Sequence, residues 1–83
     1  MANEVRDVPE NERYELRVDG ELAGFADYRR DGQRVLLPHA EVDPSRRGRG
    51  LATELAAAVY ADLEARGLEA VPTCGFMRVK QPH

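Results

Sequence analysis

The sequence predicts an α+β fold: a three-stranded antiparallel meander, followed by a helix that crosses over to a strand parallel to the third. Three observations carry this prediction. Apolar and charged residues alternate over residues 13–18, Asp-Gly pairs stand at 19–20 and 31–32, and large aliphatic residues recur every fourth position from Leu51 to Leu63. With 83 residues the chain has room for one core, so we expect one domain.

The three meander strands are expected over residues 13–18, 21–29 and 34–42, joined by hairpins at the Asp-Gly pairs. The second is less regular, because Phe25 falls on the face opposite Leu22. Pro38 has no N–H to donate to a ladder, so the third strand is at an edge or bulged there. Residues 1–12 carry four acids and little apolar material, which predicts a loose N-terminal arm before a domain over residues 13–83.

A helix is expected over residues 53–66, with Gly67 as its C-cap. The short apolar run at 68–71 suits a buried strand that Pro72 ends. A right-handed crossover makes this strand a parallel neighbour of the third. Residues 73–83 are enough to begin a further helix but barely enough to complete one.

Composition limits the possible functions. The formal net charge of −3 argues against a general nucleic-acid binder. There is no apolar run of membrane-spanning length and the acidic start is unlike a signal peptide, so the expected location is the cytoplasm. One cysteine, Cys74, and two histidines leave no disulfide framework and little for a metal, so no metal site is expected.

The segment PSRRGRGLATEL at residues 44–55 places three arginines and two glycines at the start of the predicted helix. A helix start offers free N–H groups, and glycines let an anion approach the backbone. A P-loop is excluded because the sole lysine is Lys80, and the dinucleotide fingerprint is weak because Thr53 stands where Gly or Ala is needed. RNA binding is disfavoured by the acidic chain and few aromatic residues, while a solvated charged turn stays the simpler alternative.

The hexapeptide RGRGLA matches [Q/R]-x-x-G-x-[G/A], and the sequence here resembles the GNAT superfamily of N-acetyltransferases. Together with LPHAEV at 37–42 and PTCGF at 72–76, it is similar to a very small GNAT subfamily that carries H-T-E-V, R-G-x-G-[IL]-[AG] and P-x-C-[SP]-F. Two positions depart from that pattern, Ala40 for threonine and Gly75 for serine or proline.

The resemblance implies that acetyl-CoA is the acyl donor and that no metal is required. Its pyrophosphate would bind the loop, and its pantetheine arm would pair with the third strand near Ala40 and Val42. The third and last strands would then diverge, with the thioester between them near Glu41 and the segment after Pro72. The loop residues implied to bind the cofactor are Arg47, Gly48, Arg49, Gly50, Leu51 and Ala52.

Three residues are candidates for the chemistry. Cys74 is either a nucleophile that accepts the acetyl group or a small core residue. His39 and Glu41 share a strand face and could deprotonate an incoming ammonium or activate Cys74. The alternative is a hydrogen-bonded structural histidine and a glutamate paired with an arginine.

The resulting prediction is an acetyl-CoA-dependent N-acetyltransferase acting on an unidentified amine. The chain is too short for the helices that larger members of the superfamily place over the acceptor, so its acceptor cleft is expected to be open, which suits a flexible or macromolecular amine. The alternative is a coenzyme A-binding module without turnover. So short a chain is also expected to leave one sheet face uncovered, which favours self-association into a homo-oligomer.

Overall fold

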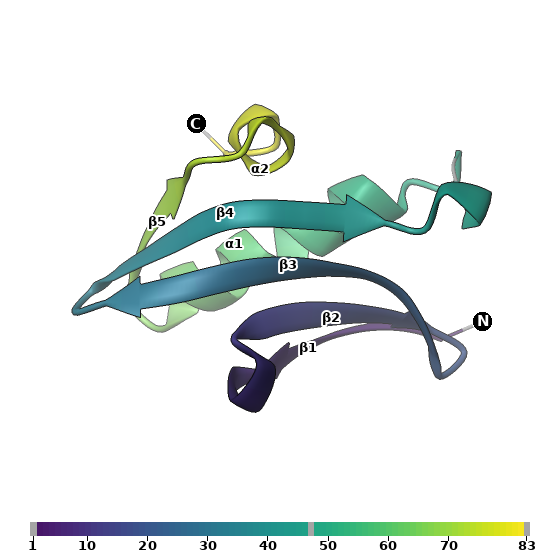
Figure 1. The fold of residues 1–83 in the computed structure, drawn as a ribbon, viewed down its shortest axis with the longest axis horizontal. Helices are drawn as coiled ribbons and strands as arrows, with labels where there is room; N and C mark the ends of the chain where they lie inside the picture. The colour runs from purple at the N-terminus through teal and green to yellow at the C-terminus, as the bar shows by residue number, and fades with distance from the viewer. Residues whose placement is uncertain (1, 47, 83) are drawn as a thin grey trace.

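The computed structural model describes residues 2–46 and 48–82 and contains a five-stranded mixed sheet (Figure 1). The strand order is β1-β2-β3-β4-β5, in which β1 to β4 are antiparallel and β5 is parallel to β4. The predicted α+β class and the parallel crossover strand are therefore confirmed. The elements are β1 (Asn3–Val8), η1 (Pro9–Asn11), β2 (Arg13–Val18), β3 (Glu21–Asp31), β4 (Arg34–Val42), η2 (Pro44–Arg46), α1 (Leu51–Ala65), β5 (Glu69–Pro72) and α2 (Gly75–Val79).

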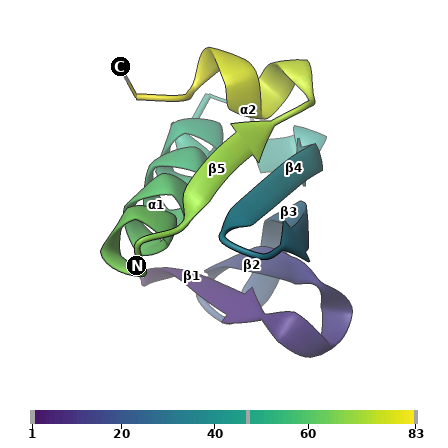
Figure 2. The same cartoon turned by 90° about the vertical axis from the view of Figure 1, so that its left-hand side faces the viewer.

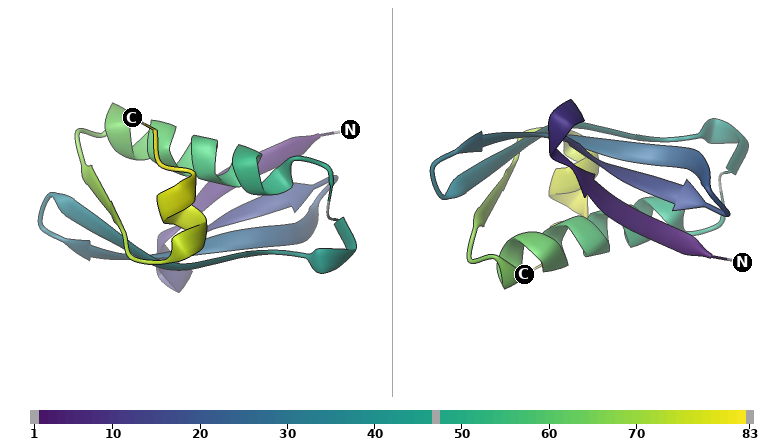
Figure 3. Two further views of the ribbon diagram at one scale, coloured as in Figure 1. Left: turned by 90° about the horizontal axis from the view of Figure 1, so that it is seen from above. Right: turned by 90° about the horizontal axis from the view of Figure 1, so that it is seen from below.

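The expectation of a loose N-terminal arm is wrong, because residues 3–8 form the edge strand β1. It pairs with β2 along its whole length (Figure 3, right). The strand is polar in sequence and is held by contacts that composition does not reveal. Asp7 accepts a hydrogen bond from the Tyr28 hydroxyl at 2.6 Å and pairs with Arg66 of α1 at 3.1 Å, while Val5 packs against the core. The meander therefore has four strands instead of three.

Two bulges set which side chains share a face. In β3 the extra residue is Ala23, and it places Leu22 on the same face as Phe25, contrary to the simple alternation of the sequence. In β4, His39 pairs with Asp27 of β3 and Leu36 pairs with Arg29. Two residues of β4 therefore stand opposite one residue of β3 between these pairs, which is a bulge at Pro38. The second bulge confirms the prediction made from that proline.

The core lies between one face of the sheet and the helices, with α1 on that side of the strands (Figure 2). Leu16, Leu37 and Leu55 are fully buried there, together with Met77 of α2. The helix begins at Leu51, two residues before the predicted start, because Gly50 takes a left-handed conformation as its N-cap. The C-terminal segment completes α2, a helix of five residues, and Met77 anchors it in the core.

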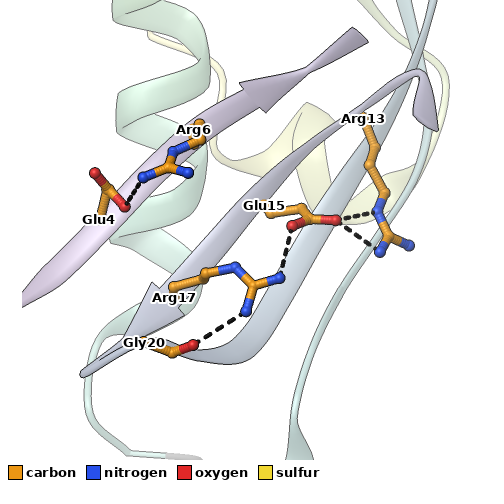
Figure 4. A network of polar contacts seen from close by, with 6 residues as sticks. All are labelled: Glu4, Arg6, Arg13, Glu15, Arg17 and Gly20. Atoms are coloured by element: carbon orange, nitrogen blue, oxygen red, sulfur yellow. Dashed lines mark hydrogen bonds and ion pairs between the residues drawn. The ribbon is translucent and has the colours of Figure 1, made fainter. Parts of the chain in front are cut away.

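The opposite face carries none of the described helices and is covered by its own charged side chains. Glu15 is only 6% exposed on this face, because Arg13 and Arg17 pair with its two carboxylate oxygens at 2.8 and 3.1 Å (Figure 4). The Arg13 guanidinium also lies 5.0 Å from the centre of the Phe25 ring. We call this surface the helix-free face. It is polar and locally ion-paired, and the predicted self-association stays a prediction.

Candidate acetyl-CoA site

The parallel strands β4 and β5 pair over only four residues and then diverge. Pairing runs from Arg34↔Glu69 to Leu37↔Pro72, and the Thr73 N–H still reaches the Leu37 carbonyl at 3.1 Å. Beyond that point the chain leaves the sheet for α2, while β4 continues to Val42 with β3 as its neighbour (Figure 1). The second half of β4 therefore has one side with no strand partner among the described residues. This is the separation that the sequence prediction required.

A cleft of about 550 Å³ begins at this unpaired half of β4 and reaches the first turn of α1. It is bounded by the end of β4, the loop before α1, the start of α1, and α2. Its lining residues are Glu41, Val42, Pro44, Arg46, Gly48, Gly50, Leu51, Ala52, Thr53, Phe76 and Lys80. Five of the loop positions and strand positions named from the sequence are in this set: Val42, Gly48, Gly50, Leu51 and Ala52.

Backbone groups supply the anion-binding character of the cleft. At the start of α1 the Glu54 N–H donates to the carbonyl of the N-cap Gly50 at 3.0 Å, and the N–H groups that precede Glu54 in the first turn have no partner within the helix. Gly48 and Gly50 have φ of 81° and 70°, and a Cβ at either would meet no atom within 4 Å. An anion can therefore approach the start of the helix without a side chain in its path.

Among the described residues, one arginine lines the cleft beside this backbone. Arg46 lines the cleft and is held by Glu21 at 2.9 Å and by Asp43 at 3.6 Å. Ser45 donates its backbone N–H and its hydroxyl to Asp43 at 3.0 and 2.9 Å, which keeps the pKa of that carboxyl below its usual value. Arg49 is exposed and does not line the cleft, and the predicted ligand Arg47 lies outside the described residues.

Lys80 is a cleft residue that sequence reasoning did not assign. It follows α2, and its Nζ donates to the Thr53 Oγ1 at 3.0 Å, across the mouth of the cleft from the loop. In the sequence it stands 27 residues from Thr53, so only the packing of α2 beside the start of α1 brings the two together. Phe76 of α2 joins the lining in the same way. The one feature of the sequence that could have drawn attention to Lys80 is that it is the sole lysine.

His39 and Glu41 are brought together as expected from their spacing. The His39 Nε2 and the Glu41 Oε2 lie 3.3 Å apart, and both side chains are more than half exposed on the helix-free face. The His39 ring stands 5.9 Å from that of Phe25. Ala40, between them, is buried toward the opposite side. The pair therefore stands in the half of β4 that has no β5 partner, with solvent access for an amine.

Cys74 is placed elsewhere. It is the N-cap of α2, where its Sγ accepts the Met77 N–H at 3.5 Å, and it packs half-buried against the core on the helix side of the sheet. Tyr60 lies nearby and donates its hydroxyl to the Met77 carbonyl at 2.7 Å. Burial, with the nearby Cys74 adding to it, raises the pKa of Tyr60 to about 12. The structure thus groups Cys74 with Tyr60 and Met77, and it places His39 and Glu41 on the other face.

Among residues 2–46 and 48–82, no group of three or more histidine, cysteine or acidic side chains could hold a metal ion. Over the same residues, no helix has both the length and the apolar character needed to span a membrane.

A family model described as GCN5-related N-acetyl-transferase matches residues 13–81. The chain belongs to this family. No curated protein sequence gives a significant match. The family match covers β2 to α2, so the diverging strands, the glycine loop and the cleft all lie inside the GNAT domain.

Solved structures support the same assignment. A ribosomal-protein-alanine N-acetyltransferase from Brucella melitensis biovar Abortus 2308 is 25% identical with a TM-score of 0.58, covering 72% of this chain and 49% of that one. The aminoglycoside acetyltransferase AAC(6')-Iy, in complex with the bisubstrate analogue CoA-S-monomethyl-acetylneamine, is 29% identical with a TM-score of 0.59, covering 76% and 50%.

A third structure supports the fold alone. The aminoglycoside acetyltransferase meta-AAC0020, from an uncultured soil metagenomic sample and in complex with sisomicin, has a TM-score of 0.65 at 14% identity, covering 84% of this chain and 56% of that one. The chain thus spans about half the length of the GNAT structures it matches.

Proposed function

We propose that this GNAT chain transfers the acetyl group of acetyl-CoA to an amine. The observation that carries the proposal is the continuity of one cleft from the unpaired half of β4 to the glycine-flanked start of α1. The exposed edge of β4 suits the amide groups of the pantetheine arm, because a strand edge pairs with amides. The start of α1 suits the pyrophosphate of the same ligand, because a helix start binds phosphates. Among the similar structures, AAC(6')-Iy was solved in complex with CoA.

In the proposed binding mode the pyrophosphate contacts the free N–H groups at Gly50 to Ala52, with Arg49 and Arg47 adding attraction from the loop. The pantetheine amides pair with the β4 backbone near Ala40 and Val42. This places the thioester toward the point where β4 and β5 diverge. Lys80, whose Nζ has hydrogen atoms beyond the one given to Thr53, supplies a further phosphate contact.

The chemistry we propose is direct transfer. The ammonium first loses a proton to the His39–Glu41 pair, which lies in the unpaired half of β4 with solvent on its other side. The neutral amine nitrogen then attacks the thioester carbonyl carbon, a new C–N bond forms, and the C–S bond breaks. The electron pair of that bond leaves with the coenzyme A sulfur as a thiolate, and the second amine proton passes to the base or to water.

The covalent route through Cys74 stays a prediction and is separable by experiment. Serine is a good N-cap, so Cys74→Ser retains the hydrogen bond to Met77 and removes the thiol, whereas Cys74→Ala removes both. With direct transfer, Cys74→Ser keeps near wild-type turnover, and incubation with acetyl-CoA alone adds no acetyl group to the wild-type protein. A hydroxylamine-labile acetyl adduct on Cys74, with loss of turnover in Cys74→Ser, would establish the covalent route instead.

The proposed function is tested by two measurements on the full chain. Calorimetry with coenzyme A reports binding, and release of free coenzyme A thiol from acetyl-CoA in the presence of a panel of amines reports transfer. Glu41→Gln should lower turnover strongly while leaving coenzyme A affinity nearly unchanged, because the proposed role of Glu41 is on the amine. Binding without transfer to any amine would identify a coenzyme A-binding module and reject the enzyme.

A further inference from the structure

A second hollow, of about 260 Å³, lies against the helix-free face where β3 begins and β4 ends. We call it the β3–β4 hollow. It shares Glu41, Val42 and Pro44 with the acetyl-CoA cleft, so the two spaces meet at the end of β4. Its remaining lining residues are Leu22, Ala23, Gly24, Phe25 and Asp43. A group bound in the hollow would therefore stand beside the strand that we assign to the pantetheine arm.

The floor of the hollow is apolar and its placement depends on the β3 bulge. Because Ala23 is the extra residue, Leu22 and Phe25 point to the same face and both line the hollow. Leu22 is 41% exposed, which is high for a large aliphatic side chain on a sheet. Without the bulge Leu22 would lie on the face opposite Phe25, and the hollow would lose that side chain from its lining.

The rim of the hollow is anionic, and the carboxylates on it are not equivalent. No lysine or arginine is among its lining residues in the described part of the chain, and the Arg13 guanidinium that lies 5.0 Å from the centre of the Phe25 ring is paired with Glu15. Asp43 accepts hydrogen bonds from Ser45 and shares Arg46 with Glu21, at 3.6 and 2.9 Å respectively. Among residues 2–46 and 48–82, the ion-pair partner of the Glu41 carboxylate is His39. Glu41 is therefore the rim carboxylate that has no arginine or lysine partner among the described residues, and it is placed to receive an ammonium.

We infer that the β3–β4 hollow is the acceptor site and that its substrate is a primary amine on an apolar arm, with the ammonium at Glu41 and the arm against Leu22 and Phe25. The inference rests on the proposed acetyl transfer and names its substrate class. The pantetheine arm runs along the unpaired half of β4 from the start of α1, and the acceptor reaches that half of the strand from the helix-free face. The two meet at Glu41, which is also the proposed base.

The same features define which amines are rejected. An amino acid carries a carboxylate next to its amine, and that carboxylate would face Glu41 and the nearby Asp43, so repulsion disfavours it. A very small amine lacks the apolar surface that Leu22 and Phe25 would cover.

The test compares three amines at saturating acetyl-CoA: 2-phenylethylamine, methylamine, which lacks the arm, and phenylalanine, which has the arm and a carboxylate. We expect kcat/KM for 2-phenylethylamine to exceed that for each of the others by at least about tenfold, the scale of discrimination that apolar pockets and like charges provide. Leu22→Ser should reduce the preference over methylamine several-fold. Val79→Ser is the matched control, because Val79 is the other exposed large apolar side chain in the described part of the chain and lies on α2, outside the hollow.

Equal rates for 2-phenylethylamine and methylamine, or an unchanged preference in Leu22→Ser, would overturn the acceptor assignment while leaving the acetyltransferase standing. The hollow is also tested without turnover, by titrating the coenzyme A-loaded protein with 2-phenylethylamine and following amide chemical shifts. Saturable shifts at Leu22 and Phe25 that Leu22→Ser weakens support the site even if no amine is acetylated. Absence of such shifts overturns it. The failure of the activity and the failure of the site are thereby distinguished.

Discussion

Two glycines at opposite ends of α1 allow the cofactor assignment to be tested without confusing binding with stability. Gly50 precedes the helix with φ of 70°, and Gly67 follows it with φ of 69°. At both, a Cβ would meet no atom within 4 Å, so alanine introduces no clash. Gly50 lines the acetyl-CoA cleft and Gly67 does not. Gly50→Ala and Gly67→Ala are therefore matched in backbone conformation. They differ in that only position 50 lies in the proposed coenzyme A site.

The expected loss of stability is the same for both variants. A non-glycine residue in the left-handed region costs about 1–2 kcal/mol, and the smaller entropy of the unfolded alanine chain returns about 0.4–1 kcal/mol. Each variant should thus lose roughly 1 kcal/mol, which lowers Tm by about 4–8 °C for a domain of this size. Only Gly50→Ala places a methyl group beside the N–H groups at the start of α1. Losing one charge-assisted hydrogen bond of about 1.5–3 kcal/mol weakens coenzyme A binding about ten- to hundredfold.

Thermal unfolding of both variants and calorimetry with coenzyme A, at a temperature where both are folded, measure these quantities. The expected result is similar Tm values, with weakened affinity in Gly50→Ala alone. If Gly50→Ala bound coenzyme A as tightly as Gly67→Ala does, the pyrophosphate would not lie on this backbone, and the loop assignment would fail.

Three further predictions concern charge. Arg47→Ala combined with Arg49→Ala should weaken coenzyme A binding by about 1–3 kcal/mol in calorimetry, and an unchanged affinity would remove the side chains from the phosphate site. Lys80→Met should weaken coenzyme A binding about tenfold, whereas Arg78→Met, two residues earlier in α2, should leave it unchanged. Dephospho-coenzyme A, which lacks the 3′-phosphate, shows which phosphate Lys80 contacts. If the partner is the 3′-phosphate, Lys80→Met should bind dephospho-coenzyme A as tightly as the wild type does. Hydrogen bonds from the flanking arginines hold the pKa of Glu15 below its usual value, so its stabilisation is complete above the unfolded pKa of about 4.3 and is lost as pH falls through the folded pKa. Urea titrations should therefore show a smaller loss of stability below about pH 4 in Glu15→Gln than in the wild type, and equal slopes would contradict this.

The parts of the fold that sequence could predict are those with local causes. Alternation over residues 13–18, the Asp-Gly turns and the four-residue repeat of α1 each act within a few positions, and they gave the meander and the crossover. β1 could not be predicted in this way, because Asp7 is held by Tyr28 and Arg66 from distant parts of the chain. The Ala23 bulge was also hidden, since an extra residue in a strand changes the face of Leu22 without changing composition.

The site residues that the sequence could predict are likewise those placed by local features of the chain. Spacing alone predicted that His39 and Glu41 would meet, and the glycine pattern located the loop before α1. The position of Cys74 depends on the direction that the chain takes after β5. That direction is set by α2, whose Met77 packs into the core. Lys80 depends on the same packing. Alternation of polar and apolar residues assigns a sheet face only within a strand, so it could not place Cys74 or Lys80, which follow β5.

The divergence of β4 and β5 has a cause in the chain itself. Leu37 pairs with Pro72, and Pro38 follows it, so a proline stands on each strand where the ladder ends. The N–H groups of Glu69 and Thr73 point to β4, so an N–H at position 72 would point away from β4. Pro72 is therefore tolerated in the ladder and does not itself end the pairing. The Pro38 bulge then turns the rest of β4 toward β3 alone. Because these features need no ligand, the cleft is formed before acetyl-CoA arrives, and binding does not have to separate the strands.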